Sequence, residues 1–313
     1  MTTVVAPQTQ ALTASATPSL ADYVERWLAE LDASPATKQG YRAGIRAYMR
    51  FLESEGLTGA QRGDIVAYKQ FLQATYAPGT VSTRLTPVRG LYGYLHAVTG
   101  APNIAEGVRG AKATHGHRKD ALSPSQVQAL LKATGNARDY ALVLLMVSTG
   151  LRTIEVARAQ VGDLRTMAGK TVLDVWGKGR ESKDALVIVT PPVEAAIRAY
   201  LKERGALEDT APLFASTSNR NVGGPMTTRS ISRLVKEHLV SAGLSSSRLT
   251  AHSLRHTAVT LSLLGGATLQ EAQAMARHAN ITTTQVYAHT LERLQGHGEA
   301  AVTAFLTKEG VAL

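Results

Sequence analysis

The sequence predicts a mainly α-helical protein of two domains, the second of which also holds a small β-sheet. Apolar residues recur at helical spacing through most of the chain after residue 18. Two short runs rich in β-branched residues, 171–176 and 185–190, interrupt this pattern near the middle of the chain. A basic stretch that contains Gly and Pro separates two helical regions. With 313 residues, the chain is long enough to bury a core in each domain.

The N-terminal region is predicted to be a small four-helix domain that follows a disordered tail. Residues 1–18 contain few large apolar side chains and no hydrophobic period, which is typical of disorder. Helices are expected over 19–100. Ser34-Pro35 is a good helix start, because a capping hydroxyl precedes a proline that needs no N–H donor. Further helices are expected near 62–75 and 78–98.

Basic residues of this domain form a candidate DNA-binding surface. Lys38, Arg42 and Arg46 follow one another at four-residue spacing, and Arg84 and Arg89 lie together further along the chain. Such a stripe is either an ordinary solvated face or a face that contacts DNA. The net charge of +10 favours a polyanionic partner, and basic residues exceed acidic ones in both halves of the chain. A merely basic protein with no such partner is the alternative.

Residues 101–120 are predicted to be a linker between the two domains. Within them, Arg118 and Lys119 belong to a basic cluster that we expect to contact DNA phosphates. His115 and His117 could hold a metal, but an isolated His-x-His pair in a linker rarely does. The chain has no cysteine, which excludes disulfides and thiolate metal sites. No stretch has the length or composition of a signal peptide or membrane span, so we expect a cytoplasmic protein.

The second domain is expected to cover residues 121–313. A capped helix begins after Leu122, and an apolar helix over Tyr140–Ser148 ends at Gly150. The two β-rich runs flank the glycine-containing segment 177–183, which is the pattern of a β-hairpin. Helical spacing returns from Pro192 onward. Two glycines between residues 295 and 298 predict a break there, so a C-terminal tail is expected from about residue 297.

Three motifs of this domain carry residues suited to phosphoryl transfer. They are Thr149-Gly-Leu-Arg-Thr-Ile-Glu155, His252-Ser-Leu-Arg-His-Thr257 and Ala276-Arg-His-Ala-Asn-Ile-Thr-Thr-Thr-Gln-Val-Tyr-Ala-His289. Attack on a phosphodiester places negative charge on its non-bridging oxygens, and the planar, always charged guanidinium of arginine binds two such oxygens at once. A tyrosine can act as the nucleophile when neighbouring cations and a base activate it. An ordinary surface ion pair is the alternative for the Arg-x-x-Glu spacing of the first motif.

These motifs, in this order, resemble the tyrosine site-specific recombinase (integrase) family over residues 121–292. The resemblance implies a catalytic set of one tyrosine nucleophile, two phosphate-binding arginines and two histidines, with Glu155 orienting the first arginine. It also implies a general-acid lysine in the hairpin, for which Lys178 in Gly-Lys-Gly is the first candidate and Lys183 the second. The set implied is Arg152, Lys178, His252, Arg255, His278 and Tyr287.

Two features of the motifs need a separate interpretation. The sequence reads Ala276-Arg277-His278 where the family commonly has Leu-Gly-His. His252 and His256 have a spacing used by zinc ligands, but an arginine between them and the missing glutamate of the zinc-protease motif disfavour a metal. We therefore expect His256 to be a structural histidine with a satisfied hydrogen bond, and no metal or cofactor to be needed.

The resemblance also implies the architecture and the reaction. It indicates a SAM-like helical core-binding domain followed by a mixed α/β catalytic domain. Strands would be cut through a 3′-phosphotyrosyl link and exchanged through a Holliday junction, with a dimer on each pair of inverted half-sites and a tetramer in synapsis. A second, partner recombinase and docking of the C-terminal tail on a neighbouring protomer are also compatible with it, as is a tail folded onto its own domain. The length is closest to Xer-like and mobile-element recombinases.

Two other functions remain open from the sequence. The first is a type IB topoisomerase-like enzyme that shares the chemistry but does not exchange strands. The second is a non-enzymatic DNA-binding regulator on the same scaffold. The presence of all six catalytic residue types argues against the regulator. The target sequence itself cannot be derived, since a few base contacts and DNA shape determine it.

Overall fold

The computed structural model describes residues 19–111, 121–176, 182–295 and 297–308. The expected N-terminal tail, much of the expected linker with Arg118 and Lys119, and the hairpin lysine Lys178 lie outside the described residues. Contacts divide the chain into two compact units, Met1–Gly116 and His117–Leu313. Each unit is described by itself below.

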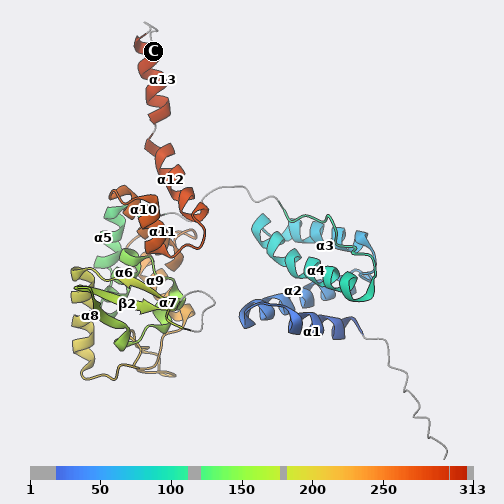
Figure 1. The fold of residues 1–313 in the computed structure, drawn as a ribbon, viewed down its shortest axis with the longest axis horizontal. Helices are drawn as coiled ribbons and strands as arrows, with labels where there is room; N and C mark the ends of the chain where they lie inside the picture. The colour runs from blue at the N-terminus through green and yellow to red at the C-terminus, as the bar shows by residue number, and fades with distance from the viewer. Residues whose placement is uncertain (1–18, 112–120, 177–181, 296, 309–313) are drawn as a thin grey trace, which may run out of the picture. The chain divides into compact units, whose positions relative to one another are not determined.

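The first unit consists of four helices in the described residues, as the sequence predicts (Figure 1). Ser34 caps the second helix with its hydroxyl, and Pro35 occupies the first helical position. The third and fourth helices begin and end within one residue of their predicted bounds. The four are α1 (Leu20–Glu30), α2 (Pro35–Ser54), α3 (Arg62–Thr75) and α4 (Pro78–Thr99).

Aromatic side chains fill the centre of this unit. Tyr48 of α2 contacts Tyr68 of α3 and Tyr92 of α4, with ring centroids 5.0 and 6.2 Å apart. The buried Tyr92 hydroxyl donates to the carbonyl of Gly59 at 2.6 Å. Such pairs stabilise a core beyond the area they bury, because ring edges meet ring faces.

The second unit combines helices with one three-stranded antiparallel sheet of order β1-β2-β3 (Figure 1). Its elements are α5 (Pro124–Lys132), α6 (Ala137–Thr149), α7 (Thr153–Arg158), the 3₁₀ helix η1 (Val161–Asp163), β1 (Leu164–Met167), β2 (Lys170–Val175), β3 (Ala185–Ile188), α8 (Pro191–Arg204), α9 (Thr228–Ser241), α10 (Ala251–Leu264), α11 (Leu269–Ala276), α12 (Thr282–Gln295) and α13 (His297–Lys308).

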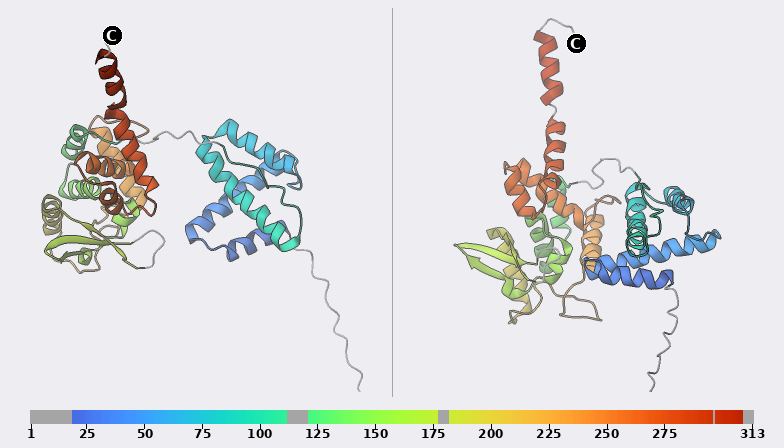
Figure 2. Two further views of the ribbon diagram at one scale, coloured as in Figure 1. Left: turned by 45° about the horizontal axis from the view of Figure 1, so that its top comes forward. Right: turned by 45° about the vertical axis from the view of Figure 1, so that its right-hand side comes forward.

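The apolar helix α6 is the centre of this unit. Most of its middle is buried, and it packs against α8 and α10. The helices α10, α11 and α12 lie together at one end of the unit, and the sheet and α8 lie at the other (Figures 1 and 2). The turn that follows α6 therefore lies close to α10, one of the C-terminal helices that carry candidate catalytic residues.

The predicted hairpin is present, and the sequence missed one strand of its sheet. Strands β2 and β3 pair antiparallel, with Leu173 opposite Val187. The missed strand β1 has only four residues, and three of them are exposed. A short, exposed strand lacks the alternation of apolar and polar residues by which strands are recognised. In the part of the chain that the structure describes, no helix is long and apolar enough to cross a membrane.

Candidate active site

The first candidate arginine, Arg152, lies in the short turn that connects α6 to α7. Helix α6 ends at Gly150 in the left-handed conformation, with φ +64°, and Arg152 is the N-cap of α7. This turn favours glycine because of its left-handed conformation, and a Cβ on Gly150 would lie 3.4 Å from the Cβ of Ala258 in α10. The turn between α6 and α7 thereby holds Arg152 beside α10.

Glu155 binds Arg152 twice, in the contact that their spacing predicts. One carboxylate oxygen accepts the backbone N–H of Arg152 at 2.7 Å, and the other accepts its guanidinium at 2.8 Å. Glu155 is only 2% exposed. Burial opposes its charged form, but Arg277 and Arg152 together lower the pKa of this carboxyl below its usual value. The carboxylate therefore stays charged and fixes the arginine that faces it.

Arg255 is buried at the centre of the site, with 3% of its surface exposed. It lies in the first turns of α10, which Thr250 precedes as the N-cap, as the sequence predicts. Its guanidinium donates to the carbonyl of Gly150 at 2.6 Å and to the carbonyl of Ala276. Burial and the neighbouring arginines lower its pKa to about 10, so it remains a cation at neutral pH. Arg255 thus links the turn before Arg152 with the end of α11.

His278 follows α11 and is held by three hydrogen bonds. Its backbone N–H donates to Gln273 at 3.1 Å, and its carbonyl accepts the Gln273 side chain at 3.1 Å. Its Nδ1 lies 2.8 Å from the hydroxyl of the fully buried Thr284. Burial, and then the nearby arginines, lower the pKa of His278 to about 4, so the ring is neutral at pH 7. When Thr284 donates to Nδ1, the ring proton lies on Nε2, as a donor for an anion.

Tyr287 of α12 is almost completely buried, with 5% exposed. It packs against Val259 of α10 and Ala276 of α11 in a small apolar cluster. Burial raises the pKa of its phenol to about 12, and Arg255 opposes this shift. Its ring is nearly parallel to that of His278, at a centroid distance of 6.4 Å. A proton must therefore be removed before this phenol can act as a nucleophile.

His256 was expected to be structural, and sequence reasoning missed it as a member of the site. Its Nδ1 forms a hydrogen bond with the hydroxyl of Tyr287, and the two ring centroids lie 5.4 Å apart. It does have a hydrogen-bond partner, as expected, but that partner is the candidate nucleophile. The exposed His252 meets the His256 ring edge to face at 4.7 Å. The only signal in the sequence was its position, next to Arg255 and one helical turn after His252.

Arg277 is the second site residue whose contacts the sequence did not reveal. It ends α11 in the left-handed conformation, with φ +53°, which costs a non-glycine residue about 1 kcal/mol. Its guanidinium donates to Glu155 at 2.8 Å and to the Met275 carbonyl at 2.6 Å. The departure from Leu-Gly-His therefore places a second guanidinium on the carboxylate that already holds Arg152.

The structure describes one of the two candidate lysines of the hairpin. Lys183, just before β3, binds the carboxylate of Asp163, and its Nζ lies 2.8 Å from the side-chain oxygen of Gln160. The ammonium group of Lys183 is thus paired with the carboxylate of Asp163, which ends η1 just before β1. Lys178 lies outside the described residues, between the end of β2 and the start of β3.

The candidate DNA-binding residues of the first unit have different surroundings. Lys38 donates to the carbonyl of Ala29 at 3.0 Å, and Arg42 binds Glu25 at 2.9 Å, so both tie α2 to α1. The guanidinium of Arg84 lies 4.3 Å above the ring of Tyr76. Arg46 and Arg89 are exposed. Exposed ion pairs exchange readily with solvent and other anions, so the Arg42–Glu25 pair does not prevent Arg42 from binding phosphate.

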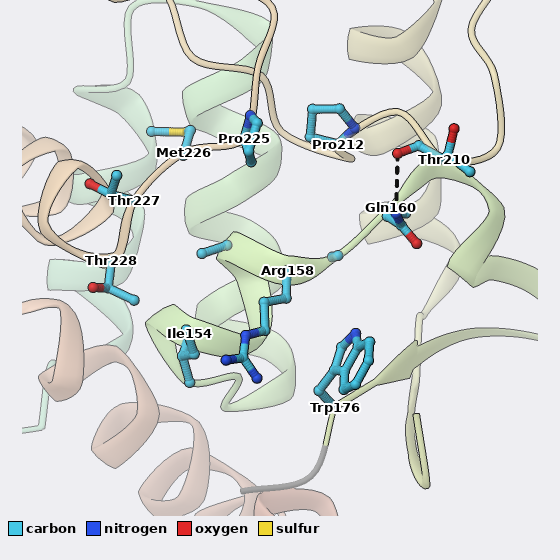
Figure 3. Close-up of a pocket in the computed structure, with 12 residues that line it drawn as sticks. Ile154, Arg158, Gln160, Trp176, Thr210, Pro212, Pro225, Met226, Thr227 and Thr228 are labelled. Carbon is cyan, nitrogen blue, oxygen red and sulfur yellow. Dashed lines mark hydrogen bonds between the residues drawn. The ribbon is translucent and has the colours of Figure 1, made fainter. Parts of the chain in front are cut away.

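A pocket of about 780 Å³ lies beside α7, apart from the catalytic set. It is lined by Ile154 and Arg158 of α7, by Trp176 after β2 and by the segment that leads into α9 (Figure 3). The Arg158 guanidinium stands 5.9 Å from the Trp176 ring. Of the candidate catalytic residues that the structure describes, none lines this pocket. Within the described residues, no group of three or more His, Cys, Asp or Glu side chains could hold a metal ion.

Comparisons with known proteins agree on one family. The phage integrase family model matches residues 120–293. The chain is 30% identical over 296 residues to tyrosine recombinase XerC of Myxococcus xanthus, covering 88% of this chain and 96% of that protein. Among solved structures, it resembles the XerH site-specific recombinase bound to palindromic difH substrate, at a TM-score of 0.70, 18% identity and coverage of 90% and 85%. It also resembles a lambda integrase dimer bound to a COC′ core site, at a TM-score of 0.68, 17% identity and coverage of 84% and 96%.

Proposed function

Because the chain belongs to the phage integrase family, we propose that it is a site-specific DNA recombinase that cuts and rejoins strands through a phosphotyrosine bond. The observation that carries this proposal is the convergence of five side chains from distant segments. Arg255 contacts the carbonyls beside Arg152 and His278, and Tyr287 stacks on His278. Such a set supplies cations, neutral donors and a nucleophile around one phosphate.

The arginines bind the scissile phosphate in this mechanism. Arg152 and Arg255 approach it from α7 and α10, and their charges balance the extra negative charge that develops on the non-bridging oxygens. His252 and His278 donate hydrogen bonds to the same oxygens. The neutral state of His278 suits this role, because a fixed donor stabilises the transition state without a proton transfer. Glu155 acts through Arg152, which it orients.

Tyr287 attacks phosphorus, and the bond to the 5′ oxygen breaks. The products are a 3′-phosphotyrosyl link and a 5′-hydroxyl, so the bond energy is retained and no cofactor is required. Lys178 protonates the leaving oxygen. Two observations support this lysine: its Gly-Lys-Gly motif lies in the sequence between two strands that pair, and Lys183 is bound to Asp163.

The partner is double-stranded DNA carrying paired inverted half-sites. The net charge of +10 and the exposed Arg46 and Arg89 of the first unit support contact with phosphates. A dimer on each site and a tetramer in synapsis would follow from exchange between two duplexes, and a second recombinase could replace half of the protomers. The enzyme would act where its DNA lies, in the cytoplasm. The relatives are named recombinases, which favours strand exchange over a topoisomerase or a regulator.

Loss of the nucleophilic oxygen tests the proposal directly. Tyr287→Phe should bind DNA normally but form no covalent complex with a nicked suicide duplex, whose half-site is first recovered by selection from random DNA. The matched control is Tyr140→Phe, which removes the hydroxyl of an exposed tyrosine in the same unit. The control should form the covalent complex at the normal rate. A covalent band from Tyr287→Phe on a denaturing gel would reject Tyr287 as the nucleophile.

A further inference from the structure

The hydrogen bond between His256 and Tyr287 connects two helices that pack directly against each other. His256 lies on α10 and Tyr287 on α12, and these helices contact one another along the site. The imidazole Nδ1 faces the phenol oxygen, with the ring centroids 5.4 Å apart. Because Tyr287 is almost fully buried, few groups can reach its hydroxyl. An imidazole that already holds this hydroxyl is placed to take its proton.

Tyr287 needs such a proton acceptor. Burial raises the pKa of its phenol to about 12, so the nucleophilic phenolate is scarce at neutral pH. His278 is poorly suited to accept the proton, because its pKa is lowered to about 4 and its Nδ1 is engaged with Thr284. The lysine of the hairpin is assigned to the leaving oxygen, which needs a donor. The residue that already contacts this proton is His256, through its hydrogen bond with the Tyr287 hydroxyl.

We propose that His256 is the general base that removes the Tyr287 proton, an inference that rests on the proposed recombinase function. As the phenol oxygen forms its bond to phosphorus, its proton moves to His256 Nδ1, which gives an imidazolium ion. The bond from phosphorus to the 5′ oxygen breaks, and that oxygen takes a proton from Lys178. In the rejoining step, the 5′-hydroxyl attacks phosphorus and gives its proton back to Lys178. The bond from phosphorus to the Tyr287 oxygen breaks, and the imidazolium returns its proton to that oxygen. Atoms and charges balance in both directions.

We expect proton transfer to His256 to depend on bound DNA, because of the groups that surround it. His252 faces it from the same helix, Tyr287 from α12, and Arg255 and His278 surround the phenol. Arg255 is a cation close to the phenol, and it repels an imidazolium that forms beside that phenol. The bound phosphate brings negative charge that increases during attack, and this charge stabilises the imidazolium when it forms. The base would thus be active only with the substrate in place.

Substitutions that keep the hydrogen bond but cannot accept a proton test the inference. His256→Asn and His256→Gln can both hold the Tyr287 hydroxyl through a side-chain amide. Formation of the covalent complex should slow by about 10²–10⁴-fold in both variants, which is the usual contribution of a general base. Half-site binding and thermal unfolding should stay near those of the parent protein. Two variants are used so that one misfolded protein does not decide the result.

A more acidic phenol should remove the need for the base. Tetrafluorotyrosine, whose hydroxyl ionises near neutral pH, is incorporated at position 287 in the His256→Asn protein. Cleavage should then recover most of the lost rate, whereas the same amino acid at exposed position 140 should give no recovery. A normal rate for His256→Asn, or a slow rate that tetrafluorotyrosine fails to raise, would assign His256 a positioning role only and overturn the inference. If Tyr287→Phe still formed a covalent complex, the proposed function would fail instead.

Discussion

At the scale of single residues, the site depends on one buried carboxylate shared by two arginines. Glu155 is approached by Arg152 from its own helix and by Arg277 from the end of α11. The strained backbone of Arg277 is maintained because its side chain completes this contact. Removal of a buried partner leaves the other charges uncompensated, which costs more than an exposed ion pair contributes.

Glu155→Gln should therefore destabilise the second unit by about 3–5 kcal/mol, because it leaves two neighbouring guanidinium groups without their shared anion. Urea unfolding gives the free energy of unfolding of both proteins.

Since the folded state lowers the pKa of Glu155, its stabilisation is present above the ordinary value of 4.5 and is lost as pH falls below it. The parent protein should thus lose stability more steeply than the variant on acidification below pH 4.5. Equal slopes would contradict a charged Glu155.

His278 should remain neutral well below the pH at which an ordinary histidine gains a proton. Its pKa is lowered from 6.5 to about 4, by burial first and then by Arg255 and Arg152. The unfolded chain therefore binds the proton more readily, and this residue lowers the stability of the fold as pH falls from 6.5 to 4. NMR of protein with ¹⁵N-labelled histidine should show no titration of His278 between pH 7 and 5.5. A midpoint near 6.5 would contradict the neutral-donor role.

At the scale of elements, most helices could be predicted and the contacts between them could not. Caps and prolines such as Ser34-Pro35 mark helix starts through local chemistry, and the end of α6 is marked by Gly150. Strand β1 was missed because it is short and exposed. The two contacts that reshape the site join residues far apart in sequence, Arg277 with Glu155 and His256 with Tyr287. Packing of α10, α11 and α12 against their neighbours brings these residues together, and no local sequence pattern predicts that packing.

The hairpin between β2 and β3 carries the general-acid prediction. Lys178→Ala should cleave ordinary DNA slowly, because the leaving 5′ oxygen then departs without a proton. A substrate with sulfur at the bridging 5′ position should restore the rate, since a thiolate leaves without protonation. The control is Lys183→Ala, which removes a lysine bound to Asp163 and should show no rescue by sulfur. Rescue of Lys183→Ala alone would transfer the role to that lysine.

At the scale of the whole molecule, the C-terminal helix is a candidate for contact between protomers. The apolar side chains Val302 and Phe305 of α13 are 60% and 61% exposed. Truncation after Gln295 should leave binding to a single half-site unchanged, but weaken assembly on paired half-sites and reduce strand exchange. Native gels and an exchange assay measure the two effects. Val302→Ser with Phe305→Ser is the matched full-length variant and should act similarly.

The opposite result for the tail would be a loss of stability in the isolated protein. A markedly lower melting temperature of the truncated monomer would mean that α13 stabilises its own unit. The family resemblance is compatible with a tail that docks on a neighbouring protomer and with a tail folded onto its own domain. The sequence alone could not decide between them, because exposed apolar residues suit either kind of contact.

The central claim is that Tyr287 becomes covalently attached to DNA, and mass spectrometry tests it most directly. The covalent complex formed on a suicide half-site is digested with nuclease and trypsin. Cleavage after Arg277 and Arg293 releases a peptide in which Tyr287 is the single tyrosine. This peptide should carry a nucleotide joined through its 3′ phosphate to the Tyr287 oxygen. A nucleotide on any other peptide, or a complete absence of covalent complex from active protein, would contradict the account.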